Sequence, residues 1–213
     1  MRRFFSLVLL SVVLLPLTGN ARTIADLFAI EPGEVFPLLT RTNRLDMVDY
    51  YLSGQKVAVA NNLAGESSLE ELDSTYLKVN TSGSRVVEMM MRTVGKDTVI
   101  TVIETVMTPV LDSRLTQWNS HWQRYTSDKL FQAPAIDDFI VKKMPRDLRA
   151  DLHDAMIFPL VRLTFKGENH DIIEATHGLE RFLAPNEYKR FADFLKPSLY
   201  YRFDGLKIKP AKK

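Results

Sequence analysis

The distribution of hydrophobic positions separates one long apolar segment at the start of the chain from a series of shorter patterns. Residues 4–17 are apolar apart from two serines and one proline, and Arg2 and Arg3 precede them. Small residues follow at the two positions that a signal peptidase reads, the second being Ala21. Because the segment is short for a membrane span, the pattern predicts a secretory signal peptide over 1–21 with cleavage after Ala21. An uncleaved N-terminal anchor is the alternative.

Two helical patterns follow this segment. Thr23 is a suitable N-cap for a short helix. The apolar face of that helix has three members: Ile24, Leu27 and Phe28. A second helix is expected to begin after Thr42-Asn43 and to stop at Gly54. Its expected buried stripe has three members: Leu45, Val48 and Leu52.

The clearest element of the sequence is a β-hairpin. Residues 85–94 and 98–107 are rich in β-branched side chains, and Gly95-Lys96-Asp97 joins them. The second run is apolar on both faces except at Glu104. This predicts a central strand that is covered on both sides.

Flanking segments extend this hairpin into a sheet. Residues 110–118 are expected to return as a third strand that is more exposed, and residues 76–79 are expected to pair on the other side. Residues 56–60 predict a further strand, and residues 61–68 predict a polar loop.

The C-terminal half is predicted to have a similar succession of helices and hairpins. Its expected elements are a helix over 145–155, a hairpin of 160–165 and 171–176, a helix between Pro185 and Pro197, and a strand over 199–203. The fold class predicted is α+β: a mostly antiparallel sheet built from hairpins, with helices packed on one face. The mature chain is read as a single domain over 22–213, with two similar lobes, 22–135 and 136–213, as an internal division.

Composition and charge narrow the functional classes. The chain has 213 residues, 46% of them hydrophobic, with 28 Lys and Arg against 26 Asp and Glu. Removing Arg2 and Arg3 takes away two basic and no acidic side chains, so the mature chain is formally neutral. A strongly basic nucleic-acid binder is therefore excluded. No cysteine is present, which excludes disulfides, a thiol nucleophile and a lipoprotein anchor.

One set of segments resembles a known family of exported proteins from Bacteroides-like bacteria, recorded as a domain of unknown function. The resemblance covers most of the mature chain, and Asn43-Arg44-Leu45-Asp46 before a tyrosine-rich helix end is its most specific part. It is carried by residues 36–51, 53–54, 61–65, 87–89, 106–113 and Trp122. The family implies export from a Gram-negative bacterium, and it brings neither a catalytic residue nor a cofactor.

An aromatic cluster is the first candidate for a binding site. Its four members are Trp118, His121, Trp122 and Tyr125. Polar residues between them are expected to leave the rings partly exposed, so that they form the floor of a peptide or carbohydrate groove. The alternative is a hydrophobic edge that closes one end of the sheet.

An acidic cluster on the predicted helix over 145–155 is the second candidate. Its four titratable members are Asp147, Asp151, His153 and Asp154. Helical spacing places the three aspartates on one face, where they could perform acid–base chemistry. The alternative is an ordinary solvated face opposite the buried Leu148 and Leu152.

The remaining residues do not form a recognisable chemical motif. The four histidines lack the spacing of a helical zinc site, and neither a nucleophile elbow nor a phosphate-binding glycine loop occurs. No metal and no cofactor are therefore expected.

The hypothesis favoured by the sequence is an exported, non-enzymatic binding or assembly module in the periplasm or cell envelope. Hairpins with edges that could pair with another chain motivate it. Its expected partner is an envelope protein, peptide or glycan, without nucleic acid and without a membrane span after cleavage. The alternatives are a periplasmic hydrolase that uses the acidic cluster, and a carrier of an apolar ligand held between the sheet and the helix that contains Phe191.

Overall fold

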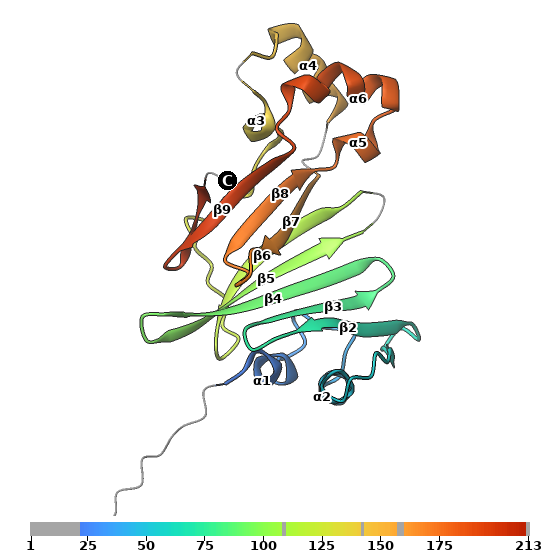
Figure 1. The fold of residues 1–213 in the computed structure, drawn as a ribbon, viewed down its shortest axis with the longest axis vertical. Helices are drawn as coiled ribbons and strands as arrows, with labels where there is room; N and C mark the ends of the chain where they lie inside the picture. Colours follow the sequence, from blue (N-terminus) through green and yellow to red (C-terminus); the bar gives the residue numbers. More distant parts are fainter. Residues whose placement is uncertain (1–21, 108–109, 142, 157–159, 212–213) are drawn as a thin grey trace, which may run out of the picture.

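The computed structural model describes residues 22–107, 110–141, 143–156 and 160–211 (Figure 1). The predicted signal peptide over 1–21 lies outside the described residues. The elements in chain order are α1 (Ile24–Ala29), α2 (Arg41–Leu52), β1 (Val59–Ala60), β2 (Glu66–Leu72), β3 (Tyr76–Ser82), β4 (Arg85–Val94), β5 (Asp97–Val106), β6 (Asp112–Asn119), α3 (Ile136–Phe139), α4 (Arg146–Ala155), β7 (Val161–Lys166), β8 (Ile172–His177), α5 (Leu179–Phe182), α6 (Pro185–Phe191), the 3₁₀ helix Ala192–Phe194, β9 (Ser198–Asp204) and β10 (Lys207–Ala211).

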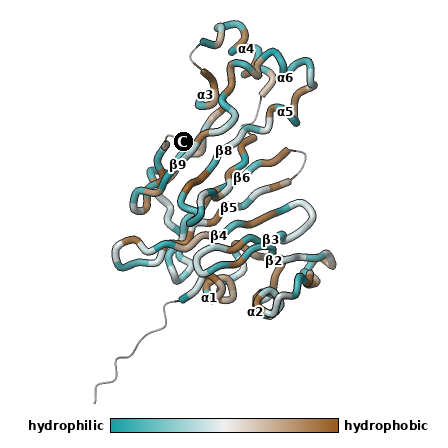
Figure 2. Tube along the Cα trace, viewed as in Figure 1, coloured by the Kyte–Doolittle hydropathy of each residue, from teal (hydrophilic) through white to brown (hydrophobic). Residues whose placement is uncertain are grey.

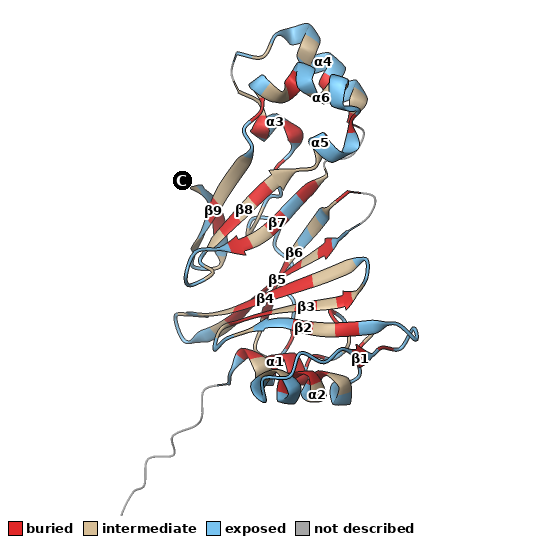
Figure 3. Ribbon diagram, turned by 45° about the vertical axis from the view of Figure 1, so that its right-hand side comes forward, coloured by how far each residue is buried: buried red, intermediate tan, exposed pale blue. Residues whose placement is uncertain are grey.

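The first six strands form one antiparallel sheet in the order of the chain. β4 and β5 pair along their whole length, from Arg85 opposite Val106 to Val94 opposite Asp97, which confirms the predicted hairpin. β6 and β3 lie on either side of this hairpin, as the sequence predicts. β4 and β5 are interior strands of this sheet, and each carries a run of buried residues, 87–90 and 99–103. Figures 2 and 3 show hydrophobic and buried segments on these strands. The fold class, α+β with antiparallel sheets, is confirmed.

Helices α1 and α2 cover one face of this sheet (Figure 1). Thr23 caps α1 as predicted, and its side chain accepts a hydrogen bond from Asp26 N. The predicted buried face of α2 is wrong, because the structure buries a face that is rotated about the helix axis from the predicted one. Leu45 and Leu52 are 43% and 72% exposed, whereas Arg44 lies in the buried face with Met47 and Val48.

A buried ion pair explains why the face of α2 that contains Arg44 is buried. The Arg44 guanidinium donates to the backbone oxygens of Leu39 and Glu31, and it lies 3.6 Å from the Glu31 carboxylate. The Glu31 carboxylate also accepts from the backbone N–H groups of Val35 and Phe36. These contacts satisfy two buried charges, so that an arginine occupies the core face of α2.

The last four strands form a second antiparallel sheet in the order β10-β9-β8-β7. Its apolar side chains share a core with the face of the six-stranded sheet that α1 and α2 leave uncovered; this core includes Met90, Ile103, Leu163, Phe165 and Ile173. The two sheets lie on either side of the predicted lobe boundary, and this shared core joins them into one packed structure.

Both outer edges of the second sheet are covered by other parts of the chain. On β7, the backbone N–H groups of Val161, Leu163 and Phe165 donate to side chains of Asp112, Ser113 and Glu88 respectively. On β10, Ile208 N donates to Leu130 O (2.7 Å), and Pro210, on the same edge, has no N–H. These edges are therefore not open for pairing with another chain.

Two strands differ from the sequence-based expectation. The first three residues of β2 fall in the predicted polar loop, and the rest of β2 and β10 fall in segments without a predicted element. α3 to α6 gather at one end of the second sheet (Figure 1). Pro185 begins α6, in agreement with the predicted start of that helix.

Candidate functional site

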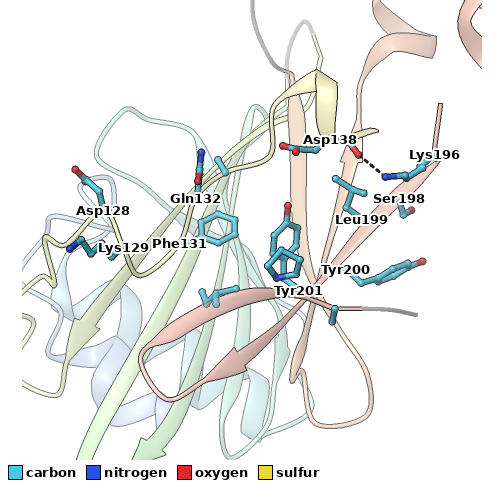
Figure 4. Close-up of a pocket in the computed structure, with 14 residues that line it drawn as sticks. Asp128, Lys129, Phe131, Gln132, Asp138, Lys196, Ser198, Leu199, Tyr200 and Tyr201 are labelled. Carbon is cyan, nitrogen blue, oxygen red and sulfur yellow. Dashed lines mark hydrogen bonds between the residues drawn. The ribbon is translucent and has the colours of Figure 1, made fainter. Parts of the chain in front are cut away.

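A cavity of about 770 Å³ lies between the β9–β10 hairpin and the segment 128–138 (Figure 4). This volume is within the range of small-molecule sites, about 300–1,000 Å³. Among the cavities described, its combination of size and apolar lining makes it the candidate site.

Local backbone contacts explain why the chain leaves a hollow here. The segment that follows β6 is fixed against β10 by the bond from Ile208 N to Leu130 O. It is fixed again at α3, where Lys196 N, just before β9, donates to Phe139 O (2.8 Å). Between these two points the segment spans the edge of the second sheet, and the cavity lies beneath it (Figure 4).

The floor of the cavity is apolar and aromatic. The rings of Phe131 and Tyr201 meet edge to face, with centroids 5.5 Å apart and planes at 79°. Leu199 and Ile208 complete this floor. Such a surface suits a ring or an alkyl chain, because aromatic side chains supply a large contact area with few rotatable bonds.

Tyr201 carries a polar group into this apolar floor. Only 6% of the residue is exposed, and its hydroxyl points toward Asp138 (Figure 4). Burial, and then the charge of Asp138, raises the pKa of Tyr201 to about 12. The phenol is therefore neutral at physiological pH and is able to donate a hydrogen bond.

The mouth of the cavity carries charges of both signs. Asp128 and Lys129 lie at one side, and Asp138 and Lys196 lie at the other (Figure 4). Lys196 Nζ donates to the backbone oxygen of Asp138 at 2.9 Å. The mouth thus provides donors and acceptors without a dominant charge.

The structure places the predicted aromatic cluster elsewhere, and it does not bring its rings together at the surface. Trp118 and Trp122 are 5% and 6% exposed and belong to the core under α1. Trp122 Nε1 donates to Leu27 O of that helix at 3.1 Å. These two indoles are core side chains, so they do not form the floor of an open groove.

The backbone turn around Trp122 shows how the two tryptophans reach the core. Trp122 has a φ of 59°, in the left-handed region that a bulky side chain rarely adopts. The Asn119 side chain stabilises the turn by accepting from His121 N (2.9 Å) and Gln123 N (3.0 Å). His121 itself is exposed and Tyr125 is half-buried, and neither lines the candidate cavity.

The predicted acidic cluster on α4 is divided among separate partners. Asp151 pairs with Arg190 of α6, and His153 lies 3.0 Å from Asp137 of α3. Asp147 and Asp154 are exposed. The arrangement is that of a solvated face, with ion pairs to neighbouring helices.

The structure also shows the position of Phe191. Phe191, expected beside an apolar ligand, is 1% exposed and packed into the core shared by the two sheets. Within the described ranges, no three His, Asp or Glu side chains lie close enough to hold a metal ion. Over the same ranges, no helix is long and apolar enough to cross a membrane.

The cavity residues were missed because no local pattern marks them. Phe131 lies in an irregular segment, and Leu199 and Tyr201 were read only as part of a strand. The alternation of Leu199 and Tyr201 on one face of β9 is the one available signal, and it does not reveal what covers that face.

Comparisons with known proteins agree with this architecture. The sequence profile of a family described as protein of unknown function (DUF3256) matches residues 17–208. A solved structure, a domain of an uncharacterized protein from Porphyromonas gingivalis W83, is similar with a TM-score of 0.78 and 22% identity, over 89% of this chain and 98% of that chain. At this identity the likeness concerns the fold. No match was found among curated protein sequences.

Proposed function

Since this chain belongs to the DUF3256 family, whose function is unknown, we propose from its structure that it is an exported, non-enzymatic module that binds a small ligand in the cavity beneath segment 128–138. The observation that carries this proposal is the cavity itself. It combines about 770 Å³ of space, which suits a small molecule, with an aromatic floor and several polar groups around it.

A binding role is preferred to catalysis because of how the titratable groups are arranged. Hydrolysis by carboxylates needs two or more such groups that converge on one substrate. On α4, Asp151 and His153 instead turn to different helices. At the cavity, one oxygen of Asp138 accepts from Ala135 N, the start of α3.

A small ligand is preferred to an added β-strand because the edges of the second sheet are occupied. Side chains of the first sheet take the outward N–H groups of β7, and Leu130 and Pro210 close β10. A peptide that enters the cavity would therefore bind through its side chains rather than through a ladder of backbone bonds.

Export is part of the proposal, and the start of the fold supports it. Arg22 Nη1 donates to Ser120 O (3.1 Å), and Thr23 caps α1. Cleavage after Ala21 leaves both contacts intact. N-terminal sequencing of the protein from its natural cell envelope should begin at Arg22, and finding Met1 would contradict the proposal.

A fluorescent probe tests ligand binding. N-phenyl-1-naphthylamine is an uncharged two-part aromatic molecule whose emission rises in apolar surroundings. We expect saturable enhancement of its emission with the chain from Arg22 onward, at one probe per protein.

Two matched variants locate the probe. Ala133 is exposed and lines the cavity, so Ala133→Trp should fill the space and abolish saturable binding. Ala135 is also exposed but lies outside the lining, so Ala135→Trp should bind within about twofold of the wild type. Equal binding by both variants, or no binding by the wild type, would contradict the proposed site.

A further inference from the structure

The chemistry of the cavity selects among ligand classes, and this selection rests on the proposed function. The floor formed by Phe131, Tyr201 and Ile208 has an apolar surface that a free phosphate would not use. Burying apolar area gives about 25 cal/mol per Å², so an alkyl chain or ring is the body that this floor favours.

The Tyr201 hydroxyl adds a requirement for the ligand's polar end. Only 6% of the residue is exposed, and its hydroxyl makes no hydrogen bond within the described residues, but the oxygen itself is reached by solvent through the cavity. Water can accept from such a hydroxyl, and a ligand oxygen in the same position would replace that water. This position lies on the side of Tyr201 that faces Asp138 (Figure 4).

The charges at the mouth argue against a charged head group. Among the residues that the structure describes, the charged side chains lining the cavity are two acids, Asp128 and Asp138, and two bases, Lys129 and Lys196. Lys196 already donates to the backbone of Asp138, the neighbour of opposite charge. An anion that approaches Lys196 therefore meets Asp138, and a cation that approaches Asp138 meets Lys196. An ionised head group of either sign would therefore lie close to a like charge, and moving an incompletely paired charge out of water is unfavourable.

We infer that the cavity takes an uncharged amphiphile: an apolar body that lies on the Phe131–Tyr201 floor, with a hydroxyl, ester or amide oxygen that accepts a hydrogen bond from the Tyr201 hydroxyl. Lys196 and Asp138 act as a pair that discriminates against ionised heads of either sign. Tyr201 is thus the specificity-determining residue of the site.

Three ten-carbon amphiphiles with the same tail test this inference. Each of 1-decanol, decanoate and decylammonium is used below its micelle concentration to displace N-phenyl-1-naphthylamine at neutral pH. We expect 1-decanol to displace the probe at a concentration at least about tenfold lower than either ion. Equal or better displacement by decanoate or decylammonium would overturn the inference.

Substitution of Tyr201 tests the hydrogen bond. Tyr201→Phe keeps the ring and its contact with Phe131, so we expect the affinity for 1-decanol to fall about fivefold to tenfold. Decane has the same tail without an oxygen, and its displacement of the probe should change less than twofold. Equal changes for 1-decanol and decane would overturn the role of the hydroxyl.

Charge variants provide a second test that does not depend on Tyr201. Asp138→Asn should improve displacement by decanoate, and Lys196→Gln should improve displacement by decylammonium, each by about threefold or more at low salt. If neither variant improves displacement by its ion relative to 1-decanol, the discriminating pair is excluded.

These outcomes distinguish a failure of the proposed binding function from a failure of the inferred ligand class. If the probe does not bind, or if Ala133→Trp fails to block it, the proposed function itself fails. If the probe binds in the cavity but the ions compete as well as the alcohol, the binding module stands and the uncharged ligand is rejected.

Discussion

Two aromatic pairs of similar geometry differ in this protein in that only one of them lies beside the candidate cavity. The ring centroids of Trp118 and Trp122 are 5.7 Å apart, and those of Phe131 and Tyr201 are 5.5 Å apart. The tryptophans are neighbours in the sequence and lie in the core under α1. Phe131 and Tyr201 come from chain segments separated by α3 to α6, and they lie beside a cavity.

The difference shows that an aromatic cluster in the sequence need not be a surface. The polar atom of Trp122 is satisfied inside the protein, because its indole N–H donates to Leu27 O. The Tyr201 hydroxyl makes no hydrogen bond within the described part of the chain and points toward Asp138 at the cavity (Figure 4). Its oxygen is therefore available to a bound molecule, whereas the indole N–H of Trp122 is not.

Loss of a tryptophan should have the largest effect on folding. Trp122→Ala removes a buried ring and should lower the free energy of unfolding by about 3–5 kcal/mol. Urea denaturation measures this change. Under conditions where the variant is folded, its affinity for N-phenyl-1-naphthylamine should stay within about twofold. A loss of stability below about 1 kcal/mol would show that this pair is not part of the core.

High pH should reveal the buried phenol of the other pair. The pKa of Tyr201 is raised by burial to about 12, against 10.0 for an unfolded tyrosine. Between pH 10 and 12 the unfolded chain therefore loses a proton that the folded chain keeps, so stability falls as pH rises. Tyr201 should contribute about 2–3 kcal/mol to this loss.

Tyr201→Phe is the control for this pH dependence. Burial also raises the pKa of Tyr76. Tyr76 is present in both the wild type and the variant, so the difference between their pH dependences isolates Tyr201. Urea midpoints measured at several pH values should fall more steeply in the wild type. Parallel curves would contradict the buried environment of the phenol.

Removal of the other floor ring should separate binding from stability. Phe131 is half-buried, so Phe131→Ala should cost about 1–2 kcal/mol of stability, less than a core tryptophan. It should weaken binding of the probe at least about tenfold. Titration and urea denaturation of one preparation give both values, and unchanged probe affinity would remove Phe131 from the site.

His121 should give the smallest effect of the four. It is exposed and its ring has no contact with the cavity, so His121→Ala should change stability by less than about 0.5 kcal/mol. Probe affinity should be unchanged. A large loss of affinity would return the groove predicted from the sequence to consideration.

The fold could be predicted where one pattern decides the outcome. The hairpin of β4 and β5 follows from two β-rich runs around Gly95, which has a φ of 64° that suits glycine. β2 was missed because its sequence, ESSLEEL, is largely polar and lies near the edge of the sheet. The phase of α2 was wrong because hydrophobicity alone does not place Arg44 inside; that requires its partner Glu31.

The site could not be predicted because it depends on contacts between distant segments. The two halves of its floor are brought together by the bond from Ile208 to Leu130, and nothing near Phe131 in the sequence indicates Tyr201 as a neighbour. The acidic helix, by contrast, has a regular spacing that is visible in the sequence. Its side chains still pair with α3 and α6 instead of converging.

A crystal structure of the chain from Arg22 onward with N-phenyl-1-naphthylamine is the most direct test of a ligand cavity at Phe131 and Tyr201. We predict one probe molecule beneath segment 128–138, with its rings against both side chains. A probe bound beside Trp118 and Trp122, or a cavity that stays without probe in crystals where it binds elsewhere, would contradict the account.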